Sequence, residues 1–127
     1  MFACPKLGSM KRDMDLVREI LLQIKNHDAK PSSWQVEIED RDPDEVGEHL
    51  RLLVERGLVR GVHAGSGGHI AYLDPELTWE GQDFVEAAED DTRWQRAKRT
   101  VLERGGALVF EVLKQALFEL AKGQMLH

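Results

Sequence analysis

The densest basic run of the chain lies at residues 93–104, where five Arg and Lys side chains stand against one Glu. Arg93, Arg96 and Arg99 recur at three-residue steps and point away from the apolar side of a predicted helix. A guanidinium binds phosphate or carboxylate through paired hydrogen bonds. These three arginines are therefore candidate contacts for nucleic acid or an acidic partner. The alternative is a solvated face that pairs with the chain's own acids, within one copy or across a dimer.

Residues 37–48 carry the opposite charge, with seven acids and one Arg. The helix predicted to begin here places three acids and the single base Arg51 on its outward face; the acids are Asp44, Glu48 and Glu55. A DNA-reading helix passes phosphates on its way into the major groove, so acids on its outer face oppose that role. An acidic face of this kind can instead serve a protein partner.

A Gly/Ser-rich stretch, A-G-S-G-G at residues 64–68, separates two predicted strands. Short strands around such a tip form a β-hairpin, which in a winged-helix domain is the wing. If DNA is bound, we expect contacts from His63, Ser66 and His69 on this wing, together with the three arginines. A phosphate cradle is not expected, because no helix start and no Lys-Ser/Thr pair follows the glycines.

The residue types and their spacing do not predict a metal site or a catalytic site. His49, His63 and His69 are the candidate metal ligands, but no cysteine joins them and no ligand-spaced pair such as H-x3-H exists. His49 lies at the edge of an apolar stripe, where a packed neutral imidazole is expected. The hydroxyls have no assignable base and orienting partner. We expect no enzyme, no catalytic residue, no metal, no cofactor and no small-molecule substrate.

The stretch 42–61 must position much of this chemistry, and it carries the clearest structural signals. Asp42 stands where an N-cap belongs, Pro43 occupies the first helical position, and Glu45 completes an acidic capping box. Gly57 is the natural left-handed residue at the end of this helix. The pattern predicts a capped amphipathic helix that leads directly into a strand.

Hydrophobic periodicity predicts the remaining elements. They are a helix at 13–27, a half-buried strand at 34–39, the hairpin strands at 58–63 and 69–73, and helices at 78–90, 91–104 and 107–122. Asp13 and Thr78 are the expected N-caps of two of these helices. Trp34, Trp79 and Trp94 are interpreted as anchors in the core or between helices.

The last predicted helix is apolar over more than half of its circumference, whereas docking on one core needs a stripe about 100° wide. The excess predicts a second apolar surface, most simply for another copy of the chain. We therefore expect a homodimer, with an interface built from Phe110, Leu113, Leu117 and Phe118.

Composition sets limits on compartment and partners. The chain has 127 residues, a net charge of −6 and a single cysteine, Cys4. The negative charge opposes sequence-independent DNA binding, and one cysteine allows no internal disulfide. No apolar run approaches the roughly 18 residues of a membrane span, and residues 1–9 do not form a secretion signal. We expect a cytoplasmic protein without membrane association.

Three stretches resemble the domain-of-unknown-function family 2513 of short bacterial and prophage proteins. They are M-K-R-D-M-D-L-V-R-E-I-L at 10–21, H-L-R-L-L-V-E-R-G-L at 49–58 and L-T-W-E-G-Q-D-F at 77–84. Trp94 and Lys98 also match the family, and the similarity covers about residues 10–120. The resemblance implies a winged-helix-like fold, a phage or prophage context and Met10 as the usual start. It implies no catalytic residue.

The run from His49 to Phe84 is also similar to winged-helix transcription regulators, but the helix that normally supports the DNA reader is missing here or replaced. We predict an α+β, mostly α, winged-helix-like fold: helix, strand, helix and β-hairpin wing, followed by C-terminal helices. Residues 1–9 are a flexible extension. Residues 10–127 form one domain, with a core at 10–77, the wing at 58–73 and the C-terminal helices at 78–122. The expected function is non-enzymatic and DNA-associated or regulatory; the alternative is a protein-interaction adaptor without DNA binding.

Overall fold

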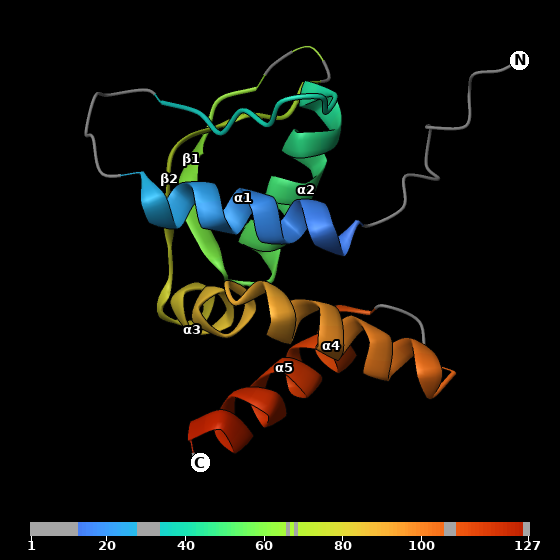
Figure 1. Ribbon diagram of the computed structural model, residues 1–127. Helices are drawn as coiled ribbons and strands as arrows, with labels where there is room; N and C mark the ends of the chain where they lie inside the picture. Colours follow the sequence, from blue (N-terminus) through green and yellow to red (C-terminus); the bar gives the residue numbers. More distant parts are fainter. Residues whose placement is uncertain (1–12, 28–33, 66, 68, 106–108, 126–127) are drawn as a thin grey trace, which may run out of the picture.

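Seven helices and strands follow one another in residues 13–27, 34–65, 67, 69–105 and 109–125, the part of the chain that the computed structural model describes (Figure 1). They are α1 (Met14–Asn26), α2 (Pro43–Glu55), β1 (Val59–His63), β2 (Tyr72–Leu77), α3 (Trp79–Ala88), α4 (Asp91–Glu103) and α5 (Phe110–Met125). The fold is α+β and mostly helical, as predicted, and is compatible with a winged-helix-like arrangement. Among the described residues, no helix is both long and apolar enough to cross a membrane.

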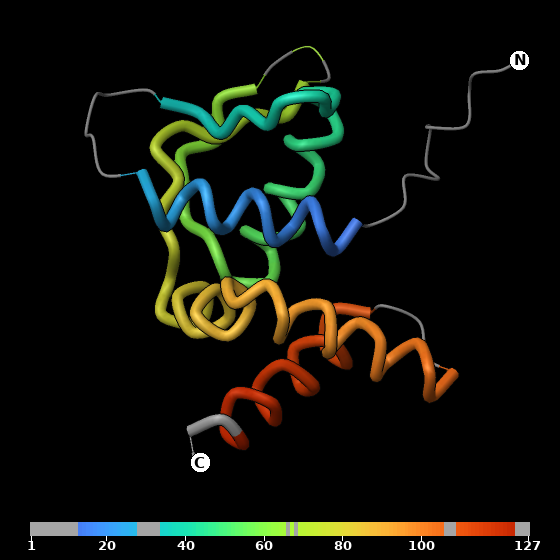
Figure 2. The backbone as a smooth tube through the Cα atoms, in the orientation of Figure 1, coloured from blue at the N-terminus to red at the C-terminus, as the bar shows by residue number. Residues whose placement is uncertain are grey.

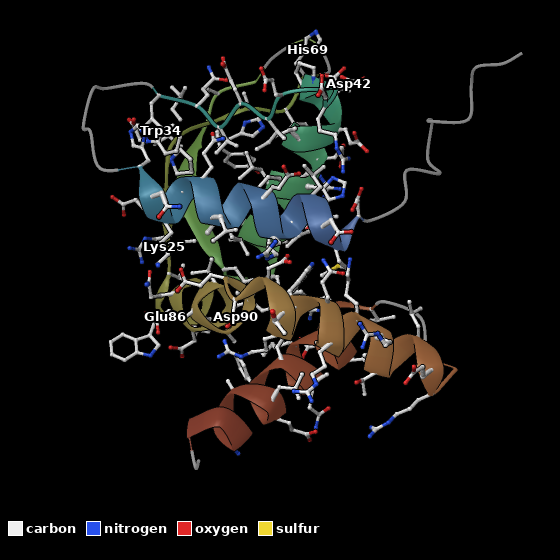
Figure 3. The ribbon with its side chains drawn as sticks, in the orientation of Figure 1. Lys25, Trp34, Asp42, His69, Glu86 and Asp90 are labelled. Atoms are coloured by element: carbon white, nitrogen blue, oxygen red, sulfur yellow. The ribbon has the colours of Figure 1, made fainter. Side chains whose placement is uncertain are left out.

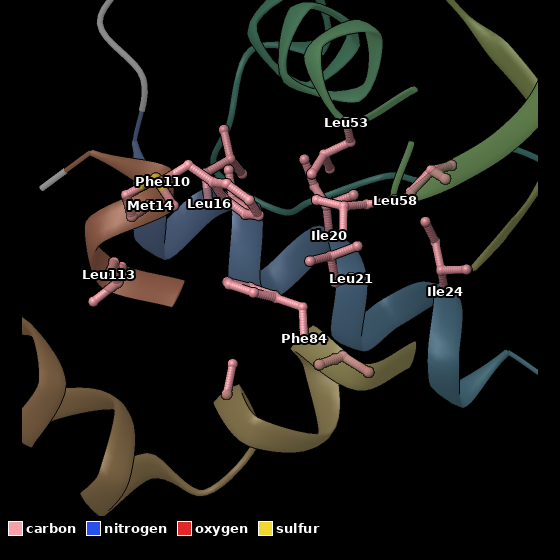
Figure 4. Close-up of a cluster of buried hydrophobic side chains, with 14 of the residues drawn as sticks. Met14, Leu16, Ile20, Leu21, Ile24, Leu53, Leu58, Phe84, Phe110 and Leu113 are labelled. Carbon is pink, nitrogen blue, oxygen red and sulfur yellow. The ribbon is translucent and has the colours of Figure 1, made fainter. Parts of the chain in front are cut away.

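The helix α1 lies between two groups of elements (Figure 1). On one side are α2 and the hairpin, and on the other are α3, α4 and α5. Leu16, Ile20 and Leu21 of α1 are fully buried. Figure 4 shows Ile20 and Leu21 between Leu53 of α2 and Phe84 of α3. The apolar stripe of α1 therefore holds the two halves of the fold together.

The start of α2 follows its sequence signals with one exception. The carboxylate of Asp42 accepts the backbone N–H of Asp44 at 2.9 Å, and Pro43 is the first helical residue, as predicted. Glu45 was expected to complete a capping box, but its carboxylate lies 3.4 Å from the guanidinium of Arg41. Arg41 precedes the cap residue, and its guanidinium competes with the backbone N–H of Asp42 for the carboxylate of Glu45.

Two glycines in this region occupy positions that a side chain would disturb. Gly57 has a φ of 85°, the left-handed conformation predicted for the end of α2, and Leu58 then donates its N–H to Leu53 at 2.9 Å. Gly47 faces the hairpin, where a Cβ atom would overlap the carbonyl oxygen of Ile70. The missing side chain at Gly47 lets α2 and the wing approach each other closely.

The wing is an antiparallel two-stranded hairpin, in which Val59 lies opposite Leu77 and His63 opposite Tyr72. The prediction placed the second strand at 69–73, which is too early. The paired residues run from Val59 and Leu77 to His63 and Tyr72, so β2 starts later than predicted and reaches further toward α3.

The strand predicted at 34–39 is wrong as a strand, although the segment is extended and forms the cyan lead into α2 in Figure 2. Its backbone bonds mostly to side chains. Gln23 of α1 both donates to the carbonyl of Glu37 and accepts its N–H, at 2.9 and 3.0 Å. The backbone carbonyl of Trp34 accepts the N–H of Asp74 at 2.9 Å. A side chain thus takes the place of a neighbouring strand.

The C-terminal helices build the second half of the core. The ring of Phe84 stacks on Phe110, with centroids 5.0 Å apart, and meets Trp94 edge-on. Trp94, Leu113 and Leu117 have no exposed surface. The helices α4 and α5 thus cover α3, and α3 covers α1 (Figure 1).

Candidate interaction surfaces

The outward face of α2 is acidic, and its charged side chains pair with one another. A DNA-reading helix would carry Arg and Lys side chains on this face. Arg51 donates to Glu48 at 2.8 Å and to Glu55 at 2.7 Å. The hydrogen bond to Glu48, with the charge of both acids, raises the pKa of Arg51 above its ordinary value. The one base on this face is therefore occupied, and the face offers no uncommitted cation to a phosphate.

Two of the predicted contact residues of the wing are exposed, and each contacts a different neighbour. His63 is exposed and packs edge-on against Tyr72, with ring centroids 5.3 Å apart. His69 is also exposed, and its Nδ1 lies 3.0 Å from the carboxylate of Asp44 at the start of α2. Ser66 lies outside the described residues. The wing tip is thus tied to an acid, which disfavours a phosphate at this point.

The predicted arginine triad of α4 divides into one structural residue and two free ones. Arg93 donates to the carbonyl of Ala87 at 2.9 Å and lies 3.4 Å from that of Glu86, so it satisfies the C-terminal end of α3. Arg96 and Arg99 are exposed, and neither forms an ion pair with the described side chains. Arg96 and Arg99 lie one turn apart on the outward side of α4, which we call the α4 face.

The predicted oligomer interface on α5 lies mostly inside the chain's own core. Phe110, Leu113 and Leu117 are buried against α3 and α4, while Phe118 is half-buried beside the ammonium group of Lys114. These three buried side chains are already engaged within one copy. The broad apolar surface of α5 is explained largely by its contacts with two helices rather than one.

The prediction that Trp79 is a core or inter-helix anchor is wrong: its side chain is 82% exposed. Trp94 is fully buried, and Trp34 is half-buried and stacked on His27 with ring centroids 3.7 Å apart. The first turn of α3 approaches the hairpin through Gly81, where a Cβ atom would overlap the carbonyl oxygen of Leu58. Trp79 projects from another side of that turn. A helical wheel could have found this, since it places Trp79 with the charged residues of α3.

One buried polar side chain, His49, joins the start of α1 to α2. The N–H of Asp13 donates to Nε2 of the fully buried His49 at 2.9 Å, and Nδ1 of His49 donates to the carbonyl of Glu45 at 2.8 Å. Both imidazole nitrogens are therefore used in a neutral ring with its proton on Nδ1. Burial acts to raise the pKa of Asp13, but hydrogen bonds from Arg41 and from the backbone N–H of Leu16 outweigh it and lower that pKa.

A second polar group joins α1 to α4. The carboxylate of Asp15 accepts the indole N–H of Trp94 at 2.7 Å and the ammonium of Lys98 at 2.8 Å. Burial acts to raise the pKa of Asp15, but the bonds from Lys98 and Trp94 outweigh it and lower that pKa. Within the described ranges, no three His, Cys, Asp or Glu side chains converge as metal ligands would. Arg96 and Arg99 of the α4 face thus remain without an ion pair to a described side chain, and Trp79 is an exposed aromatic side chain.

Comparison with known proteins identifies relatives but no function. The family model described as "Hypothetical protein (DUF2513)" matches residues 11–107. An uncharacterized protein of Haemophilus influenzae is 29% identical over 107 residues, which cover 84% of this chain and 91% of the relative. No solved structure matches the chain significantly.

Proposed function

Because the chain belongs to the family of hypothetical proteins labelled DUF2513, we propose from its own surfaces that it is a non-enzymatic protein-interaction module. Its α4 face binds an acidic surface of another protein through Arg96 and Arg99. The observation that carries this proposal is the contrast between α2, whose single outward base is locked between two acids, and α4, whose outward arginines are uncommitted.

A protein partner is favoured over DNA by the number of free charges. Each phosphate contact releases about one counterion, and non-specific affinity accumulates over several such contacts. The α4 face supplies two free guanidinium groups on a chain with a net charge of −6. Two contacts give too small an electrostatic term to hold an acidic protein on a polyanion.

Exposed apolar side chains also support a protein partner. Trp79 on α3 is 82% exposed, Val62 on β1 is 62% exposed and Leu102 on α4 is 55% exposed. Large apolar and aromatic side chains are enriched in protein interfaces, and Trp with Arg often dominates their binding energy. They give the described surface exposed apolar area that a protein partner can cover.

A non-enzymatic role is supported by the way the buried polar side chain of the described residues is used. His49 spends both ring nitrogens on backbone groups. A general base needs a free lone pair within reach of a substrate proton. The ring nitrogens stabilise helix contacts instead.

The proposal is tested by comparing the wild-type protein with the double variant Arg96→Glu/Arg99→Glu as affinity baits. We expect the wild type to retain a protein that the variant does not, and the complex to form again from the two purified components. A partner that both baits retain equally would show that α4 is not the binding surface.

The second candidate function is DNA association, for which the hairpin wing with its exposed His63 is the supporting feature. It is tested by fluorescence anisotropy on a mixed-sequence duplex at low salt, about 50 mM. We expect no binding. Salt-sensitive binding that Arg96→Glu/Arg99→Glu abolishes would replace the protein partner with DNA as the ligand of the α4 face.

A further inference from the structure

We propose that a second copy of this chain supplies an acidic surface for the α4 face, through Trp79, Asp83 and Glu86 of its α3. The inference rests on the proposed function, because it names an acidic partner for Arg96 and Arg99. We call the three α3 residues the α3 stripe.

The α3 stripe is a continuous outward face of its helix. Its residues are spaced at i, i+4 and i+7, so they lie within about 60° of one another at 100° per residue. All three are exposed. The opposite side of α3 is buried and carries Phe84 and Val85. In Figure 3, Glu86 lies on the outer side of α3, and Asp90 stands where α3 passes into α4.

The charges of the two surfaces match in sign and spacing. The carboxylates of Asp83 and Glu86 are three residues apart on α3, and the guanidinium groups of Arg96 and Arg99 are three residues apart on α4. Three residues of helix span about 4.5 Å. Two helices packed side by side can therefore form both carboxylate–guanidinium contacts together, and such contacts are the strongest of the common ion pairs.

Within one copy, Arg96 and Arg99 form no ion pair with a described side chain. The turn between α3 and α4 is short, and Arg93 fixes the first turn of α4 by donating to the backbone of α3. Among the described side chains, none of the acids forms an ion pair with Arg96 or Arg99. Another molecule can therefore supply carboxylate partners for these two groups.

Trp79 gives the contact an apolar component. An indole that is 82% exposed is costly in water, and its burial contributes in proportion to the area covered. A guanidinium also stacks favourably on an indole face. The α3 stripe thus offers an aromatic anchor beside two acids, which suits a surface that presents arginines.

A second copy is the occupant to which these features point, because every copy carries both halves of the contact. When the α3 stripe of one copy meets the α4 face of another, the reciprocal surfaces stay available for a second contact of the same kind. A single helix-on-helix contact is small, and interfaces below about 1,200 Å² are typical of weak, transient association. We therefore expect self-association that depends on protein concentration.

The test is a charge exchange followed by sedimentation equilibrium over a range of concentrations. One variant is Asp83→Arg/Glu86→Arg, and the other is Arg96→Glu/Arg99→Glu. Each variant alone brings like charges together, so we expect its self-association to fall at least about tenfold. In an equimolar mixture, both reciprocal contacts again join opposite charges. We expect the mixture to associate at least about tenfold more tightly than either variant alone.

Matched controls separate this contact from a general effect of charge. Arg60→Glu/Lys122→Glu makes the same change in net charge as Arg96→Glu/Arg99→Glu, at exposed positions on β1 and α5, and it should associate like the wild type. Trp79→Phe should weaken association without changing net charge. Circular dichroism confirms that each variant is folded.

Three results would overturn the inference. They are a wild-type protein that stays monomeric at every concentration, single charge variants that associate like the wild type, and a mixture that associates no better than its components. None of these results removes the proposed function, because capture of a different acidic protein by Arg96 and Arg99 is measured separately.

Discussion

The buried ring of His49 holds the start of α1 in place, because its Nε2 accepts the backbone N–H of Asp13 at 2.9 Å across 36 positions of sequence. His49→Phe keeps a planar ring, though a larger one, removes this acceptor and leaves a donor unpaired. We expect the free energy of unfolding to fall by about 1–3 kcal/mol. Urea unfolding of His49→Phe beside the exposed His63→Phe measures the difference. Equal stability of the two variants would contradict this role.

The lowered pKa of Asp15 makes the stability of the fold depend on pH in the acidic range. In the unfolded chain this carboxyl titrates near its ordinary pKa of 3.8, whereas in the folded chain its pKa is lower. The unfolded state therefore binds the proton first, and stability is lost as the pH falls from above 3.8 through the folded pKa. Asp15→Asn should flatten this part of the profile. Thermal unfolding of both proteins between neutral and acidic pH measures it, and parallel profiles would refute the expectation.

The close contact between Gly47 and the wing predicts that a side chain at position 47 destabilises the fold. A Cβ atom at this position would overlap the carbonyl oxygen of Ile70, a backbone atom that cannot rotate away. Gly47→Ala should therefore destabilise the fold by about 1–3 kcal/mol. Gly123→Ala is the matched control, since a Cβ atom there meets nothing within 4 Å. Denaturant unfolding distinguishes them, and a Gly47→Ala variant as stable as the control would mean that α2 and the wing separate freely.

The exposure of Trp79 predicts the fluorescence of the protein. Because Trp94 has no exposed surface and Trp79 is 82% exposed, acrylamide should quench mainly the emission of Trp79. Trp79→Phe should remove most of the quenchable, long-wavelength emission. Stern–Volmer slopes of wild type and Trp79→Phe provide the measurement. Similar slopes would show that the indole is covered in solution, which also bears on self-association.

The sequence predicted the local features well, because their determinants are themselves local. Asp13, Asp42 and Thr78 each cap a helix, and each cap depends on a side chain and the next few backbone groups. Gly57 ends α2 with a positive φ for the same reason.

Most of the incorrect predictions concern positions whose structure depends on a residue far away in the sequence. The alternation at 34–39 reads as a strand, but Gln23 of α1 takes the backbone bonds that a neighbouring strand would need. Arg93 reads as a free surface cation, yet it folds back onto α3. Trp79 was assigned by its type, although its position relative to Asp83 and Glu86 predicts an outward direction.

The central place of α1 has a consequence for synthesis on the ribosome. This helix is translated early, but Phe84 and Phe110, which lie against one of its sides, emerge much later. At about 5–20 residues per second, its apolar stripe stays without that cover for several seconds. The nascent chain therefore has to keep an uncovered helix from aggregating until its last third has been made.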